Sequence, residues 1–248
     1  MAIEIKEQYG IITAERPEFP PINLFRVPHK QGDLVLAHPA FGPNYFSKNV
    51  EVMQKNYSHP QTGERISFSE PTTSESISAA AYGFETMAKP EIFDLRWLQA
   101  GRILRTSEGV FANPPRDREG SPITDEKVLK QLLKADKKIN GIYLMDNDFG
   151  FAPYETFKRG VQDCDSFVQG GLARVLEHTQ EEQAKNLRTI ASPKFYKRGV
   201  NVWGFDDVKE PVLRVVGLDS GRVLGDGRLG VDGGWGDYDN GYAFGVLK

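Results

Sequence analysis

Cysteine is the scarcest residue of this 248-residue chain, which contains only Cys164. A single cysteine cannot form an internal disulfide, and it excludes a cysteine-rich zinc site. The four histidines do not compensate, because none has the helical spacing to a second ligand that zinc sites use. The sequence therefore predicts a fold that depends neither on oxidation nor on structural zinc.

Long hydrophobic runs and an excess of one charge are also absent. No run reaches the roughly eighteen apolar residues that a membrane-spanning helix needs, and the charged N-terminus lacks the apolar segment of a signal peptide. The 31 basic and 34 acidic residues give a net charge of −3, which leaves no broad positive field for nucleic acid or an anionic membrane. We therefore expect a soluble, cytoplasmic protein with no nucleic-acid partner and no membrane insertion.

The composition that is present is that of a folded protein, with 39% hydrophobic and 26% charged residues. We predict a single α+β domain over residues 1–248, with strand-rich N-terminal and C-terminal segments around a central helical block. Its strands are expected to form one antiparallel or mixed sheet covered by helices. The polar, turn-rich residues 113–123 form the best internal boundary.

Strand patterns dominate the N-terminal part of the chain. Residues 9–14 and 33–38 are apolar and β-branched enough to form strands, whereas four prolines between residues 17 and 28 argue against a helix or a central strand there. Residues 49–53 and 65–69 alternate apolar and polar side chains, which predicts two paired strands.

Helical spacing takes over in the middle of the chain. Hydroxyl and glutamate side chains at residues 70–76, and again near residue 125, predict helix N-termini. A further helix is expected at residues 181–190. The apolar faces of three predicted helices consist of Ile77, Ala80, Ala81 and Phe84, of Ile92, Leu95, Leu98 and Ile103, and of Val128, Leu129, Leu132 and Leu133.

The segment from residue 200 returns to strand patterns separated by glycines. From Gly217 onward it is dense in glycine and aspartate, and Asp237 and Asp239 alternate in the manner of Ca²⁺ ligands. We interpret these residues as turns between ordered strands, because Val231 and Phe244 belong to an apolar face that must be buried.

Two carboxylates follow the apolar run of residues 142–145, which predicts a buried strand. Alternation along that strand would direct Asp146 and Asp148 to the same side, where they could share Mg²⁺ or Ca²⁺. The resulting Asp-x-Asp sequence resembles that of nucleotide-sugar glycosyltransferases, although acidic pairs at strand ends also form turns. Asp163 and Asp165, expected in the first turn of the next helix, would complete a cluster of four carboxylates beside a cleft.

Cys164 is the candidate nucleophile. We expect it in the first turn of an amphipathic helix, where the helix dipole lowers a thiol pKa, as in papain-like hydrolases. Residues 163–169 resemble the cysteine segment of the NlpC/P60 peptidases, and His38 would then have to supply the base. The alternative is a structural cysteine, since Cys164 is in register with Phe167 and Leu172 on the apolar face.

Three functions follow from these patterns. The leading hypothesis is a binding or interaction module. The second is a divalent-metal-dependent enzyme that uses the carboxylates at the end of the strand at residues 142–148. The third is a papain-like cysteine hydrolase centred on Cys164.

Overall fold

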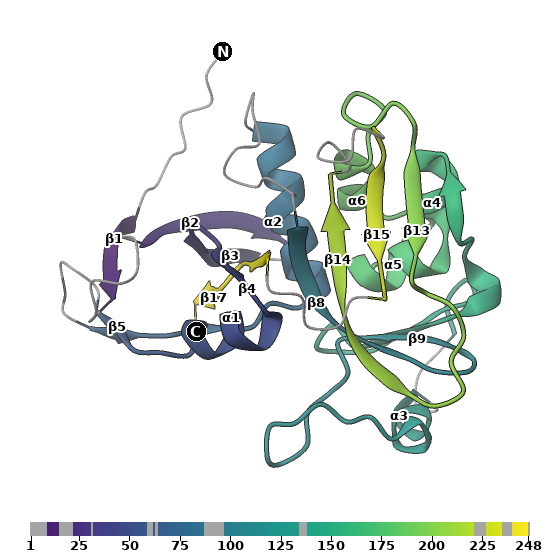
Figure 1. Ribbon diagram of the computed structural model, residues 1–248, viewed down its shortest axis with the longest axis horizontal. Helices are drawn as coiled ribbons and strands as arrows, with labels where there is room; N and C mark the ends of the chain where they lie inside the picture. Colours follow the sequence, from purple (N-terminus) through teal and green to yellow (C-terminus); the bar gives the residue numbers. More distant parts are fainter. Residues whose placement is uncertain are drawn as a thin grey trace.

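A computed structural model of the chain describes residues 9–14, 22–30, 32–58, 62, 64–86, 97–133, 138–220, 227–234 and 240–247. The predicted α+β fold is confirmed, because helices and paired strands both form. The strands divide between a seven-stranded sheet and a ten-stranded sheet, and helix α2 (Thr73–Thr86) lies between the two (Figure 1). The core is therefore built around this helix.

The seven-stranded sheet is formed mainly by N-terminal strands, in the order β6-β5-β1-β2-β3-β17-β7. Strand β17 comes from the other end of the described chain, and it pairs antiparallel with both β3 and β7. The bounds are β1 Tyr9–Ala14, β2 Ile22–His29, β3 Gly32–His38, β5 Tyr57–Ser58, β6 Arg65–Ile66, β7 Phe68–Ser69 and β17 Val246–Leu247.

The ten-stranded sheet has the main order β10-β11-β9-β8-β14-β15-β13-β12, and β16 pairs with β8 and with β4 beside this path. Its pairs are antiparallel except for β13 with β15 and β16 with β8. The bounds are β4 Phe41–Asn44, β8 Leu98–Arg105, β9 Gly109–Ala112, β10 Tyr143–Leu144, β11 Gly150–Pro153, β12 Gly160–Gln162, β13 Val200–Trp203, β14 Val212–Asp219, β15 Leu229–Asp232 and β16 Gly241–Ala243.

Helix α2 is buried on nearly all sides, and it contacts β2, β8 and two other helices. Small side chains make this possible: Ala79 and Ala80 are fully buried, and serines occupy the neighbouring positions. Such residues let a helix axis approach two sheets closely without leaving voids. The predicted apolar face with Ile77 and Phe84 is confirmed.

The other helices take more peripheral places. Helices α4 (Cys164–Gln169), α5 (Gly171–Glu177) and α6 (Lys185–Ile190) share the main core with β13 and β15. Helix α1 (Phe46–Met53) packs against β4 and β16, and α3 (Glu126–Leu133) packs against a cluster around Phe111. A short 3₁₀ helix covers Tyr154–Thr156. Among the described residues, no helix combines the length and apolar character that crossing a membrane requires.

The strand predicted at residues 49–53 is wrong, because these residues belong to α1. Phe46, Val50 and Met53 are buried at helical spacing. Asn49 is buried too, and its amide donates to Gln99 Oε1 at 2.8 Å and to the Gly241 carbonyl at 3.0 Å. A buried asparagine in this position hid the helical period and left an apparent period of two.

The helix predicted through Leu98 and Ile103 is also wrong for these two residues, which lie in β8. This strand is buried along almost its whole length, so it shows no alternation, and a buried strand cannot be told from a helix by periodicity alone. Ile92 and Leu95 lie outside the described residues.

Strand β2 occupies a central position that the prolines argued against. Pro28 is tolerated because, among the described residues, β1 pairs only with Ile22, Asn23 and Leu24 at the start of β2, and no described strand requires the missing N–H of Pro28 on that side. In α3 the face is narrower than predicted, since Leu129 and Leu133 are buried but Val128 and Leu132 are exposed.

The helix predicted after Cys164 is interrupted at Gly170, whose extended backbone ends α4 and starts α5. The break lets α5 lie directly against Thr156, since a Cβ on Gly171 would collide with the Thr156 side chain. The segment beyond residue 217 contributes β15, β16 and β17, and Val231 and Phe244 are buried as predicted. Asp237 and Asp239 lie outside the described residues.

The position of β17 predicts a strong effect of a short deletion. Ending the chain at Gly245 removes the strand between β3 and β7, including the buried Val246. Loss of about 2 kcal/mol of apolar burial, together with the ladder hydrogen bonds, should lower the melting temperature by at least about 5 °C. Calorimetry checks this, with Leu132→Ala as the control because Leu132 is exposed. Equal melting temperatures for the two variants would contradict the prediction.

Candidate functional site

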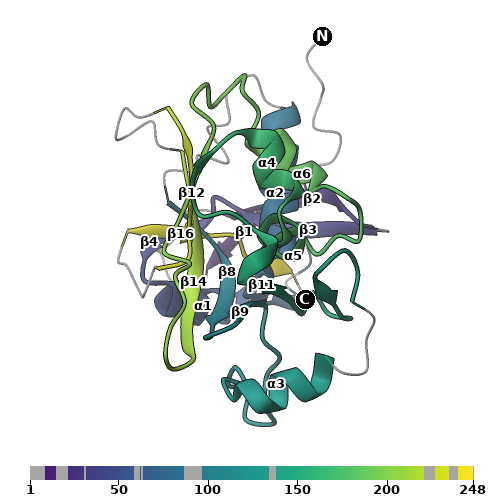
Figure 2. The same cartoon turned by 90° about the vertical axis from the view of Figure 1, so that its right-hand side faces the viewer.

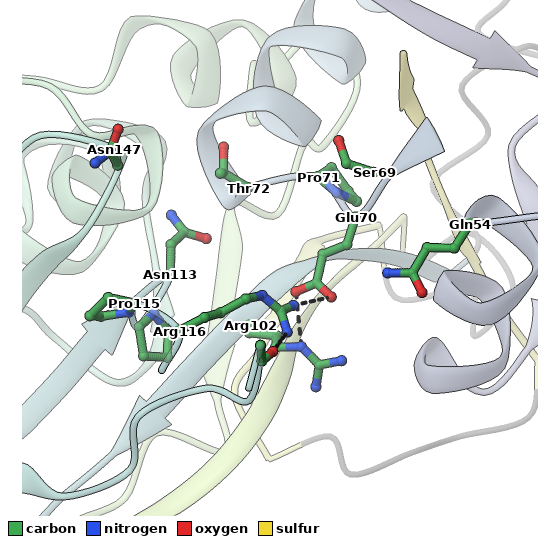
Figure 3. A pocket seen from close by; sticks show the side chains of 12 residues that line it. Gln54, Ser69, Glu70, Pro71, Thr72, Arg102, Asn113, Pro115, Arg116 and Asn147 are labelled. Atoms are coloured by element: carbon green, nitrogen blue, oxygen red, sulfur yellow. Dashed lines mark hydrogen bonds and ion pairs between the residues drawn. The ribbon is translucent and has the colours of Figure 1, made fainter. Parts of the chain in front are cut away.

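A pocket of about 380 Å³ opens where α2 begins, between residues contributed by both sheets and by the loop after β9 (Figure 3). Polar side chains and three prolines share its walls. The lining residues are Gln54, Ser69, Glu70, Pro71, Thr72, Arg102, Asn113, Pro114, Pro115, Arg116, Gly120 and Asn147.

An ion-pair bridge occupies one wall of this pocket. Arg102 Nε donates to Glu70 Oε1 at 2.9 Å, and an Arg116 terminal nitrogen donates to Glu70 Oε2 at 2.7 Å. The Glu70 side chain is 14% exposed and that of Arg102 is 21% exposed, whereas Arg116 is more open. Two guanidinium groups against one carboxylate leave this wall with a positive charge.

Two contacts fix the position of the Arg102 guanidinium, one through Nε and one through its central carbon. Its Nε is bound to Glu70, and its carbon lies 5.0 Å from the centroid of the Phe46 ring. Figure 3 shows the tip of the group directed away from Glu70. Within the described part of the chain, the two terminal nitrogens of Arg102 donate to no acceptor. The pocket thus contains donors that are positioned but unused.

The N-terminus of α2 forms the opposite wall. Thr72 and Glu75 form a capping box, in which the Glu75 N–H donates to Thr72 Oγ1 at 3.2 Å and the Thr72 N–H donates to Glu75 Oε2 at 2.7 Å. Asn113 binds the same helix end, because its Oδ1 accepts the Thr73 N–H at 3.0 Å. Its Nδ2 donates to the Asp148 carbonyl at 2.9 Å. The pocket wall is therefore fixed by hydrogen bonds among three segments of the chain.

Behind this wall lies a cluster of charged groups around Asp148, a side chain that is 8% exposed. Thr72 Oγ1 donates to Asp148 Oδ2 at 2.6 Å, and Lys30 Nζ pairs with Oδ1. His178 Nδ1 lies 3.5 Å from the same Oδ1. These residues come from the β2–β3 turn, the start of α2, the loop after β10 and the C-terminal cap of α5.

The environment shifts these titrations in distinct directions. Burial acts to raise the pKa of Asp148, but the hydrogen bonds from Lys30 and Thr72 and the charge of Lys30 outweigh it, and the pKa is lowered. Burial and the nearby lysine lower the pKa of His178, and Asp148 opposes them only in part. Burial raises the pKa of Glu75. A carboxylate with a lowered pKa is a weaker base than a free one.

The side chains of Asp146 and Asp148 do not lie on the same side of the chain, in contrast to the prediction from strand alternation. Strand β10 ends at Leu144, and Asn147 and Asp148 have left-handed backbones with φ of 59° and 63°. Alternation therefore stops before the two aspartates: Asp146 is exposed, whereas Asp148 is buried against Lys30.

Asp163 and Asp165 have other partners. Asp163 caps α4 by accepting the Ser166 N–H at 2.8 Å, and Asp165 pairs with Arg188 at 2.6 Å. In the part of the chain that the structure describes, no three or more His, Cys, Asp or Glu side chains gather in a metal-binding group. The element that meets Asp148 is the end of α5 at His178, and not the start of the Cys164 helix.

Cys164 is 6% exposed and belongs to the main core with Phe167 and Val168. Burial raises the pKa of its thiol, the charge of Arg188 opposes this, and Asp165 and Asp163 add to it. His38 lies edge-on to Phe25 and belongs to β3, a strand that Figure 1 shows on the opposite side of α2 from α4. The structure does not bring the thiol and this imidazole together.

Sequence reasoning missed Glu70, Arg102 and Arg116. From the sequence, the residues before α2 predict only a helix cap, and residues 113–123 predict only a boundary. A Thr-x-x-Glu capping box at a buried helix was the one local signal for this place.

A second buried carboxyl lies on the ten-stranded sheet. Asp232, at the end of β15, is 2% exposed, and its Oδ1 accepts the Gly234 N–H at 2.7 Å. Its Oδ2 has no hydrogen-bond partner among the described residues. Burial raises the pKa of Asp232 to about 7, against the Gly234 hydrogen bond and the charge of Arg105.

We predict that Asp148→Asn destabilises the protein by about 1–3 kcal/mol at neutral pH, because Lys30 and Thr72 lose a charged acceptor. Asp148 has a lowered pKa in the folded state, so its contribution is present above its unfolded value of about 3.9 and is lost as the pH falls through the folded value. Urea unfolding at several pH values measures this. The exposed Asp146→Asn serves as the control, and an equal loss in both variants would contradict the prediction.

Asp232→Asn should have the opposite pH dependence. The folded pKa of about 7 lies above the unfolded value, so the carboxyl costs stability as the pH rises from about 4 through 7. Asparagine keeps an oxygen for Gly234 and removes that cost. The variant should gain stability over the unmodified protein with rising pH, by up to about 4 kcal/mol near pH 8. Urea titrations measure the difference in free energy of unfolding between the variant and the unmodified protein. A difference that stays the same between about pH 4.5 and pH 8 would refute this prediction.

Comparison of the chain with protein families, with curated proteins and with solved structures finds no match. The geometry of the pocket is therefore the basis on which its function is inferred.

Proposed function

We propose that this protein binds a small polar molecule that carries a carboxylate or phosphate group, in the pocket at the start of α2. One observation carries the proposal: Arg102 lines the pocket with both terminal nitrogens unused by the described residues. A planar guanidinium with two free N–H₂ groups matches an oxyanion in a bidentate geometry.

The Arg102 side chain is prepared for this role. Its bond to Glu70 and its position over Phe46 fix the plane of the guanidinium before any ligand arrives. Fewer rotamers are then lost on binding, which favours affinity.

The remaining walls indicate the size and polarity of the ligand. A volume of about 380 Å³ is at the low end for small-molecule sites. Gln54 and Asn147 offer amide groups, while the prolines provide rigid apolar surface. The ligand that fits best is a small metabolite with an anionic group at one end and hydroxyl or amine groups along its body.

Glu70 has a counteracting role in this proposal. Its carboxylate already neutralises part of the positive charge on the arginine wall, because it accepts from both Arg102 and Arg116. A ligand anion therefore competes with the electrostatic effect of Glu70. Glu70→Gln keeps an amide oxygen that can accept from Arg102 Nε and removes the competing charge, so it should strengthen binding, whereas loss of the Arg102 guanidinium should weaken binding strongly.

Paired variants test the proposal. Thermal-shift measurements and calorimetry would compare inorganic phosphate, small dicarboxylates, sugar phosphates and nucleoside monophosphates with their uncharged counterparts. We expect at least one anion to raise the melting temperature while its uncharged counterpart does not. Arg102→Gln should then reduce affinity by at least about 100-fold, consistent with the loss of a charge-assisted pair worth roughly 3 kcal/mol. Glu70→Gln should increase affinity.

The control is Arg65→Gln, which removes an exposed arginine outside the pocket. Binding by the Arg102→Gln variant that equals binding by this control would overturn the proposal. So would the absence of any shift with the whole panel of anions.

A further inference from the structure

Strand β12 is the last strand of the ten-stranded sheet, and within the described residues it pairs only with β13. Figure 2 views the molecule from the side that carries this strand. An edge strand exposes a row of backbone donors and acceptors that can pair with another strand.

The hydrogen bonds of β13 show which groups of β12 face outward. The Leu229 N–H donates to Gly199 O, and the Gly233 N–H donates to Trp203 O, so the peptide groups of alternate β13 residues point toward β15. Those of Val200 and Val202 consequently point toward β12.

Val200 and Val202 are opposite Gln162 and Gly160 in the β12–β13 register. Gln162 and Gly160 therefore direct their peptide groups to β13, and the N–H and C=O of Val161 between them point to the free edge. This residue provides one donor and one acceptor for a further strand.

Two large apolar side chains lie beside this edge. Val161 is 58% exposed and Trp203 is 48% exposed. Val161 is opposite Asn201, and Trp203 is two residues further along β13, so both side chains lie on the same face of the sheet. Val200 and Val202 are buried on the other face. The exposed pair is therefore on the face away from the helices, next to the unpaired backbone.

The segment is basic before Val161 and acidic after it. Lys158 and Arg159 precede β12, and Asp163 and Asp165 follow it, all with exposed side chains. An antiparallel strand of the same sequence, centred on Val161, would place Arg159 opposite Asp163 at both ends. A parallel copy would place like charges side by side, which is unfavourable.

We propose that a second copy of this chain pairs with β12 in an antiparallel, two-fold symmetric arrangement centred on Val161. The two copies exchange the outward N–H and C=O groups of Val161, and Arg159 of each faces Asp163 of the other. The two-fold axis makes the interface isologous, so the same edge is satisfied on both sides. Val161 and Trp203 supply the apolar part of the contact.

The present partners of Arg159 do not prevent this. Arg159 pairs with Asp206 at 3.3 Å and with Asp207 at 3.6 Å, both more than 70% exposed, and its guanidinium lies 5.3 Å from the centroid of the Tyr154 ring. Exposed ion pairs of this kind contribute little, so the arginine can exchange partners at low cost. A short edge strand predicts a weak, concentration-dependent dimer rather than an obligate one.

A cysteine at the symmetry centre tests the register directly. Directly opposed residues of a hydrogen-bonded antiparallel pair have Cα atoms about 5.5 Å apart, which is within disulfide range. Under mild oxidation, Val161→Cys should form a covalent dimer, while Val128→Cys on α3, exposed at 39%, should not. Both variants retain the buried Cys164, so any contribution from that thiol appears equally in both.

Sedimentation velocity on the unmodified protein provides the second measurement. The sedimentation coefficient should rise with concentration, and Arg159→Glu should weaken the association about tenfold or more by placing like charges opposite each other. A monomer at every concentration would overturn the proposal. A dimer in which Val161→Cys crosslinks no faster than Val128→Cys would also overturn it, because the copies would then pair elsewhere.

Discussion

The buried N-terminus of α2 is the constraint on which most of the structure depends. A helix between two sheets cannot leave its first N–H groups to water, so they need partners from the protein. Glu75 and Thr72 satisfy two of them, and Asn113 accepts a third from Thr73. Asp148 binds the capping hydroxyl, and this contact ties the loop after β10 to the helix. The pocket is the space that remains where these segments converge.

Local sequence patterns predicted the parts of the fold in which one face of an element is buried. The apolar spacing of Ile77 and Phe84 identified α2, and Val231 and Phe244 identified ordered strands in a glycine-rich segment. The patterns failed where tertiary contacts decide. Asn49 is buried because Gln99 and Gly241 accept its amide protons, and nothing in residues 46–53 reveals those partners.

The candidate site was predictable only in part, for the same reason. Asp148 was singled out from its place after an apolar run, and it does lie in a cluster of charged groups beside the pocket. Its partner Lys30 is 118 residues away in sequence. Nothing in the sequence distinguishes Glu70 and Arg102 from other charged residues. They form an ion pair at the pocket only because β8 lies beside the start of α2. Local patterns carry no information on such pairings.

The location of β17 has a consequence for biosynthesis. This strand separates β3 from β7, so the seven-stranded sheet cannot be completed before residues 246–247 have been translated. Until then the inner edges of β3 and β7 have no partner, and the nascent chain exposes them while the ten-stranded sheet is still being made. Such unpaired edges are aggregation-prone, and they are what chaperones shield during synthesis. The sheet whose strands are made first is therefore completed only after residues 246–247 have been synthesised.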